Sequence, residues 1–110
     1  MVQVTRSSEH AQNAARLWQE HRHAPFPADL RGAELAGTDM VLLDADIAGC
    51  VVTWLNNGGT LAPKRSRILQ RCIEDLARVI PEITEPAGIQ YYQRLRQLAL
   101  LVSATLPGTT

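Results

Sequence analysis

The chain has 110 residues, of which 45% are hydrophobic and 20% are charged, and this length and composition are typical of one globular domain. The formal net charge is zero and the sequence pI is 6.8, which argues against a protein whose main role is to hold nucleic-acid phosphates. A domain of this size buries roughly two-thirds of the surface of its unfolded chain, so it can fold without a metal, cofactor or disulfide. We expect residues 1–110 to form a single domain.

The two cysteines, Cys50 and Cys72, lie far apart among apolar residues, and we expect two buried free thiols, as in a reducing compartment. The N-terminal residues lack the charged and apolar regions of a signal peptide. From Ile47 to Pro63 no residue is charged, but glycines and asparagines interrupt this run, and its apolar part is too short to cross a bilayer. These features predict a cytoplasmic protein without a membrane partner.

The first periodic segment predicts a helix over about residues 8–22. Small alanines and Trp18 share one helical face, with Trp18 as the main anchor, and Ser7 or Ser8 is the candidate N-cap. Two prolines in the next segment remove backbone donors and end this helix. Between them stands the single phenylalanine, Phe26, which we expect to enter the core.

The segment that follows allows two interpretations. Five of its apolar residues recur at the spacing of an amphipathic helix: Met40, Leu43, Ile47, Cys50 and Trp54. We favour a helix that begins between residues 39 and 45, with Asp39 or Asp44 as its N-cap and glycines at its end. Strands are the alternative, because β-branched residues are frequent and Asn57-Gly58 is a hairpin signal. A short β-hairpin near residues 33–43, with strands at 33–36 and 40–43 ahead of the helix, also stays open.

The last part of the chain predicts two further helices. Thr60 is the expected N-cap of the third helix, Pro63 fits its first turn, and Pro81 ends it. Thr84 is the expected N-cap of the fourth helix, which ends near Thr105. The short connection makes these helices an antiparallel hairpin. The predicted fold class is therefore all-α, a single domain of four helices.

Three segments carry a resemblance to a known group of proteins. They are Leu-Asp-Ala-Asp-Ile-Ala-Gly-Cys-Val, Leu-Gln-Arg-Cys-Ile-Glu-Asp-Leu and Tyr-Tyr-Gln-Arg-Leu-Arg-Gln-Leu-Ala. Within residues 40–102, this pattern resembles a group of small helical proteins that are common in actinobacteria. The pattern is mostly apolar and the group carries no assigned activity. The resemblance therefore implies a helical fold and no particular chemistry.

Two sets of residues suggest metal or acid–base chemistry, and we favour a structural role for each. His21 and His23 stand two residues apart, so on a helix they point about 200° apart and do not share a ligand-binding face. We expect a solvated helix terminus there, without a bound metal. Asp39, Asp44 and Asp46 form an acidic segment that lacks the glycine-bearing loop of a calcium site and any phosphate-binding motif. Helix capping explains this segment.

The start of the third helix is basic, and this is the one feature that folding alone does not predict. Cations in the first turn of a helix oppose its dipole, at a cost of some tenths of a kcal/mol. Arg94 and Arg96, beside Tyr91 and Tyr92 on the fourth helix, could extend this basic patch, since bases stack on aromatic and guanidinium planes. The candidate partner-binding residues are Lys64, Arg65, Arg67, Arg71 and Arg94.

These cations have two explanations. One is a solvated face in which Arg71 pairs with Glu74 and Asp75, three and four residues along the helix. The other is an anionic partner, which would be an acidic protein surface, the acidic segment at residues 34–46 of a second copy, or nucleic acid.

The pattern of motifs favours a protein without catalytic residues. No nucleophile elbow, dinucleotide-binding loop or meaningfully spaced Cys–His pair occurs in the sequence. Four apolar residues lie on more than one side of the fourth helix: Leu98, Leu100, Leu101 and Val102. Surplus apolar surface suits a partner or a second copy, so the leading hypothesis is a non-enzymatic protein-interaction or oligomerisation module. A nucleic-acid-associated regulator that uses the basic start of the third helix is the alternative, and an enzyme acting through the acidic segment ranks third.

Overall fold

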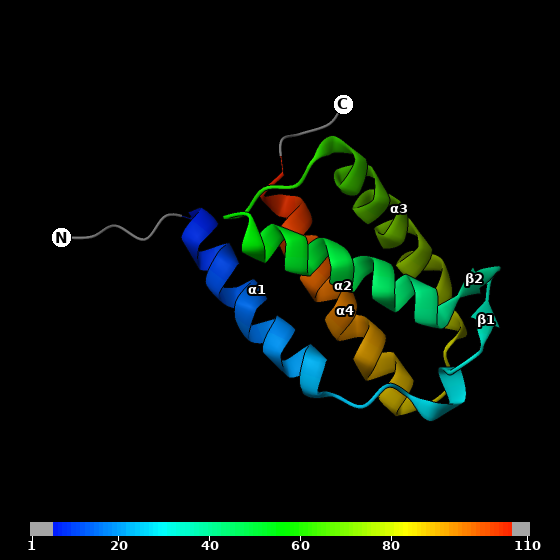
Figure 1. Cartoon of the computed structure of the whole chain (residues 1–110). Coiled ribbons are helices and arrows are strands. Elements are labelled where there is room, and N and C mark those ends of the chain that lie inside the picture. Colours follow the sequence, from blue (N-terminus) through cyan, green and yellow to red (C-terminus); the bar gives the residue numbers. More distant parts are fainter. Residues whose placement is uncertain (1–5, 107–110) are drawn as a thin grey trace.

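The computed structural model describes residues 6–106, and these form four α-helices with a small β-hairpin (Figure 1). The helices are α1 (Arg6–His23), α2 (Met40–Asn56), α3 (Pro63–Val79) and α4 (Pro86–Ala104). Short 3-10 helices at Ala28–Leu30 and Ile80–Glu82 lie in the connections after α1 and α3. The predicted all-α, four-helix fold is confirmed.

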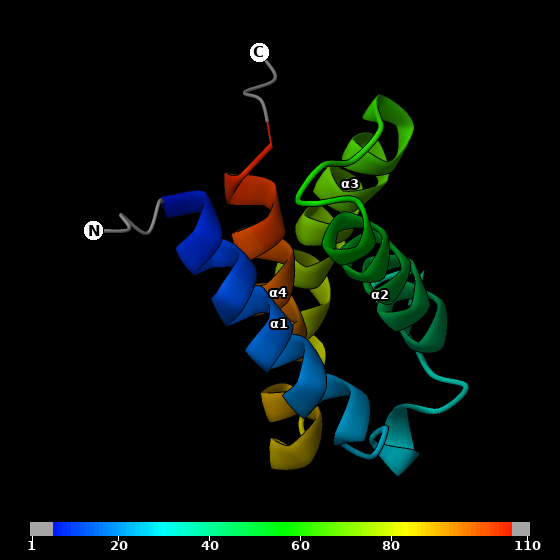
Figure 2. The same cartoon turned by 60° about the vertical axis from the view of Figure 1, so that its left-hand side comes forward.

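Helix α4 is the central element, because its contacts with the other three helices are the most extensive, although α2 also touches all three. It runs antiparallel to α3, as predicted, and also lies antiparallel beside α1 (Figures 1 and 2). Helix α2 packs against both α3 and α4, so one face of α2 is directed into the bundle. Among the described residues, no helix combines the length and the apolar character that crossing a membrane requires.

The hairpin lies directly ahead of α2 and is shorter than the sequence suggested. Its strands, β1 (Glu34–Leu35) and β2 (Thr38–Asp39), pair in an antiparallel register. Ala36 and Gly37 form the turn with φ angles of 48° and 77°, the positive values that a two-residue hairpin turn of type I′ needs at both positions. The second strand ends at residue 39 because the next residue already begins α2.

Helix α2 confirms the helical interpretation of residues 39–55. The Asp39 carboxylate caps it by accepting a hydrogen bond from the Leu42 amide at 2.9 Å. At the other end, Gly58 and Gly59 adopt φ angles of 66° and 91°, and the Gly59 amide donates to the Trp54 carbonyl at 2.9 Å. The Asn57-Gly58 pair therefore ends a helix and does not join two strands.

Three predicted N-caps are wrong. Helix α1 begins at Arg6, so Ser7 and Ser8 lie inside its first turn. Ala62 is the N-cap of α3 and Glu85 that of α4, in place of Thr60 and Thr84, because a proline occupies the start of each helix. The Thr60 hydroxyl instead donates to the Asn57 carbonyl at 3.1 Å, in the turn after α2.

Two polar contacts fix α4 against α2. The Tyr92 hydroxyl donates to the Met40 carbonyl at 2.6 Å, at the start of α2. The Trp54 indole N–H donates to the Thr105 hydroxyl at 2.9 Å, just after the end of α4. Both aromatic side chains are almost completely buried, so these contacts satisfy polar atoms that water cannot reach.

The predicted surplus apolar face of α4 is wrong, because α4 is central. Leu98 and Val102 are fully buried in the core, and Leu101 is partly buried. Of the four residues that suggested this face, only Leu100 is exposed, at 39%. Phe26 packs edge-on against Tyr91, with 5.4 Å between the ring centroids, which confirms its contribution to the core.

Two helical glycines provide a matched test of this packing. A Cβ atom at Gly88 would lie 2.9 Å from Ile83 Cγ2, whereas one at Gly49 would lie 3.6 Å from its nearest neighbour, the flexible Arg65 side chain. We expect Gly88→Ala to lower the free energy of unfolding by about 1–2 kcal/mol through overpacking. Gly49→Ala should raise it by about 0.5–1 kcal/mol through helix propensity. Urea unfolding followed by far-UV circular dichroism measures both, and equal effects would contradict the packing around Gly88.

Candidate functional site

The predicted partner-binding cations do not form one patch. Lys64, Arg67 and Arg71 are exposed on α3, one helical turn after another, and we call these three residues the basic stripe. Arg65 points to another side of α3, where its guanidinium lies close to Gly49 of α2. Arg94 lies between α1 and α4, with its guanidinium carbon 6.0 Å from the centre of the Tyr91 ring.

The basic stripe has no acidic partner in the described part of the chain. The predicted pairs of Arg71 with Glu74 and Asp75 are wrong, because Asp75 forms an ion pair with Arg78 instead. The other close contact of this kind within residues 6–106 joins His21 of α1 and Asp44 of α2. None of the three cations of the stripe therefore forms an ion pair within the described residues.

A groove of about 530 Å³ lies beside Arg67 and Arg71 of the basic stripe. Its lining residues all come from α3: Pro63, Ser66, Arg67, Gln70, Arg71 and Glu74. Gln70 donates to the Ser103 hydroxyl of α4 at 2.7 Å, which fixes one border of the groove. The groove therefore offers cationic head groups along an exposed face of a rigid helix.

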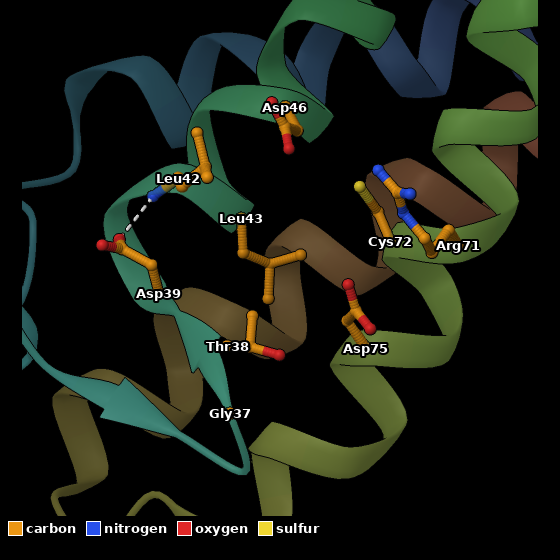
Figure 3. Close-up of a pocket in the computed structure, with 9 residues that line it drawn as sticks. All are labelled: Gly37, Thr38, Asp39, Leu42, Leu43, Asp46, Arg71, Cys72 and Asp75. Atoms are coloured by element: carbon orange, nitrogen blue, oxygen red, sulfur yellow. Dashed lines mark hydrogen bonds between the residues drawn. The ribbon is translucent and has the colours of Figure 1, made fainter.

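A second hollow, of about 230 Å³, adjoins the first, and we call it the acidic cleft (Figure 3). It lies where the hairpin, the start of α2 and the middle of α3 meet. Asp39, Asp46, Asp75 and Arg71 are among the residues that line it, although Asp39 directs its carboxylate to the Leu42 amide. Figure 3 shows Asp46 on α2 facing Arg71 across the cleft. The cleft is therefore negative overall and borders the basic stripe at Arg71.

Cys72 lines the acidic cleft but is a poor nucleophile. Its side chain is only 2% exposed, and burial, helped by the nearby Asp46 and Asp75 carboxylates, raises the pKa of the thiol to about 12. Burial also raises the pKa of the Cys50 thiol, which donates to the Arg65 carbonyl at 3.6 Å. Both cysteines are free and buried, as the sequence predicted. The cleft thus presents carboxylates beside a thiol that keeps its proton at neutral pH.

Asp44 does not join the acidic cleft, because its carboxylate turns toward α1 and α4. One oxygen accepts a hydrogen bond from His21 Nε2 at 2.8 Å, and the other accepts one from the Tyr91 hydroxyl at 2.8 Å. Burial and this hydrogen bond raise the pKa of Tyr91 above its usual range. The three side chains form a buried network, which we call the Asp44 network, that ties α1 and α4 to α2.

The prediction of a solvated terminus is wrong for His21, which is only 4% exposed. Its ring packs against Tyr91, with 4.5 Å between the centroids, and stacks with Trp18 at 6.0 Å. His21 and Ala14 are thus buried more deeply than Trp18, the anchor that the sequence suggested. His23 is exposed on the other side of α1, and its Nδ1 donates to the Gln19 carbonyl at 2.8 Å.

Sequence reasoning missed the exposed apolar residues beside the acidic cleft. Val41 is 42% exposed and Leu42 is 59% exposed, in the first turn of α2. A signal for them existed, because both fall outside the periodic apolar stripe of α2. No comparable signal pointed to the Asp44 network, whose members are far apart in the sequence.

Comparison with known proteins gives no further guidance on function. No protein-family model, curated protein or solved structure matches this chain. In the described part of the chain, no group of three or more His, Cys, Asp or Glu side chains is placed to hold a metal ion. The functional argument therefore rests on the basic stripe and the acidic cleft.

The Asp44 network predicts a specific stability defect. In Asp44→Ala, the His21 Nε2–H and the Tyr91 hydroxyl both lose their acceptor, so we expect the free energy of unfolding to fall by about 2–4 kcal/mol. His21 Nδ1 has no hydrogen-bond partner within residues 6–106, so no second contact would hold the ring. Urea unfolding followed by tryptophan fluorescence measures the loss. The control Glu20→Ala removes an exposed carboxylate from α1 and should change stability by less than about 0.5 kcal/mol; an equal loss in both variants would contradict the network.

The buried thiol of Cys72 predicts that stability falls in alkali. The unfolded chain releases this proton near pH 9.0, the ordinary pKa of a thiol, whereas the folded chain keeps it until about pH 12. The stabilisation is complete below about pH 9 and is lost as pH rises toward 12, by up to about 1.4 kcal/mol per pH unit. Urea unfolding between these pH values should show a shallower decline for Cys72→Ala than for the unmodified chain. Identical slopes would show that Cys72 ionises equally easily in both states.

Proposed function

We propose that this protein is a non-enzymatic protein-interaction module that binds an acidic protein surface along the basic stripe of α3. One observation carries the proposal. Lys64, Arg67 and Arg71 are exposed together and have no acidic partner within residues 6–106. The adjoining groove of about 530 Å³ gives a partner segment room to lie along them.

The position of the stripe supports a role in binding over a role in folding. Lys64 lies in the first turn of α3, where a cation opposes the helix dipole and costs some tenths of a kcal/mol. The first turn contains no acidic residue to offset this cost. Charges that cost folding energy and make no internal contact are better explained by an external partner.

Carboxylate groups are the ligands that the arginines of this stripe are best suited to bind. The guanidinium groups of Arg67 and Arg71 can each hold a carboxylate through two parallel hydrogen bonds. Because both residues are exposed on one rigid helix, a partner with acidic residues one turn apart could meet both at once. The apolar stems of these long side chains would pack on the partner as well.

An acidic protein is favoured over nucleic acid for two reasons. Tyr91 and Tyr92 are 6% and 0% exposed, so they offer bases no stacking surface beside Arg94. The net charge of zero agrees with this preference.

A binding experiment tests the proposal with a defined probe. Fluorescence anisotropy would follow a short dye-labelled peptide of alternating glutamate and leucine, at about 50 mM and about 500 mM NaCl. We expect saturable binding that weakens with salt, and at least about tenfold weaker binding for the double variant Arg67→Glu with Arg71→Glu.

The matched control is Arg22→Glu with Arg96→Glu, which reverses two exposed arginines on α1 and α4. This control should keep the affinity within about twofold, since its charges lie outside the stripe. An equal loss in both double variants would show attraction to the whole molecule and overturn the proposal. Tighter binding of a duplex DNA at the same salt concentration would favour the nucleic-acid hypothesis instead.

A further inference from the structure

We infer that the acidic surface bound by the basic stripe is the acidic cleft of a second copy of this chain, so that two copies form a symmetric dimer. The inference rests on the proposed function, because it names the partner of the same stripe. It draws on the acidic cleft, on the exposed apolar residues at its border and on the way the cleft and stripe adjoin.

The acidic cleft can receive a cationic side chain. Of its three carboxylates, Asp39 caps α2 and Asp75 pairs with Arg78. Asp46 forms no hydrogen bond or ion pair with any described residue, although it is partly buried. An arginine from outside would find in Asp46 a carboxylate free to form a bidentate contact.

The border of the cleft is apolar. Leu42 lines the cleft and is 59% exposed, and its neighbour Val41 is 42% exposed. Together with Leu100 they are the exposed large hydrophobic residues of the described chain. Apolar side chains beside a charged cleft give an interface the apolar centre and polar rim of protein–protein contacts. Contact with water at this point is unfavourable, and a second protein surface would relieve it.

The stripe and the cleft lie side by side on one face. Arg71 lines both the groove and the cleft, so the positive and negative surfaces meet at this residue (Figure 3). Two copies can meet face to face about a two-fold axis that lies in their shared surface, along this boundary. The stripe of each copy then lies on the cleft of the other. Every contact then occurs twice, and the assembly closes as a dimer without leaving either surface open.

Complementary charge selects a second copy over an unrelated partner. The stripe offers positive charge and forms no ion pair within residues 6–106, while the cleft on the same face offers carboxylates, of which Asp46 forms no ion pair although Arg71 faces it. A partner that covers the whole face must carry both charges in reverse order. A second copy turned by two-fold rotation presents this arrangement.

Sedimentation and light scattering measure the outcome directly. At about 50 mM NaCl we expect a particle of twice the monomer mass of 12.1 kDa, and at about 500 mM NaCl we expect dissociation. Asp46→Arg and Arg67→Glu should each weaken the dimer by at least about tenfold, because each places like charges together twice. Leu42→Ser should also weaken it while leaving the fold intact, since this side chain is largely exposed.

Mixing the two charge variants provides the decisive test. A dimer of one Asp46→Arg chain and one Arg67→Glu chain pairs opposite charges at both contacts, so mixing should restore the dimer that each variant lacks. Recovery would also show that both variants are folded. The control Glu20→Arg, on α1, should dimerise like the unmodified chain.

The outcomes separate this inference from the proposed function. A monomer at both salt concentrations that still binds the glutamate–leucine peptide through Arg67 and Arg71 would overturn the dimer and leave the proposed function standing. A salt-resistant dimer, or a dimer unaffected by Asp46→Arg and Arg67→Glu, would overturn this interface. The peptide and a second copy would compete for the same stripe, so peptide binding that weakens as the protein concentration rises into the dimeric range would support it.

Discussion

The Asp44 carboxylate is the constraint on which the arrangement of the helices depends. A partly buried carboxylate needs hydrogen-bond donors, and Asp44 obtains them from His21 of α1 and Tyr91 of α4. These two contacts fix how far each helix can slide along α2. The Tyr92 contact to the Met40 carbonyl, one turn earlier on α2, strengthens the same junction. Apolar packing holds the helices together, but these directional contacts select one arrangement of them.

This junction also determines which charges remain for a partner. With Asp44 directed into the bundle, Asp39 and Asp46 stay on the side of α2 that meets the hairpin and α3. The packing of α3 against α2 and α4 turns Arg67 and Arg71 outward. One face of the molecule consequently carries carboxylates and guanidinium groups side by side, although the net charge of the chain is zero. Segregation of charge on a neutral protein is the basis of both proposals made above.

Much of the fold could be predicted because its signals are local. The apolar spacing of residues 40–54 identified α2, the Asp39 cap set its start, and the prolines and glycines marked the connections. Predictions failed where two local signals competed, as at Thr60, where Pro63 decided the start of α3. They also failed for the apolar residues of α4, because the sequence shows which residues are apolar but not how many neighbours will cover them. Apolar side chains that would be exposed on a peripheral helix are buried on several sides of a central helix.

The sequence by itself determined the class of the fold, the helix segments, the two buried thiols and the unusual basic start of α3. Each of these follows from residue types at short spacing, which act through local hydrogen bonding and periodic burial. Only the tertiary structure decided that His21, Asp44 and Tyr91 meet, that Arg94 lies apart from the basic stripe, and that the stripe borders an acidic cleft. These relations join residues that are far apart in the sequence, and only the packing angles of whole helices place them together.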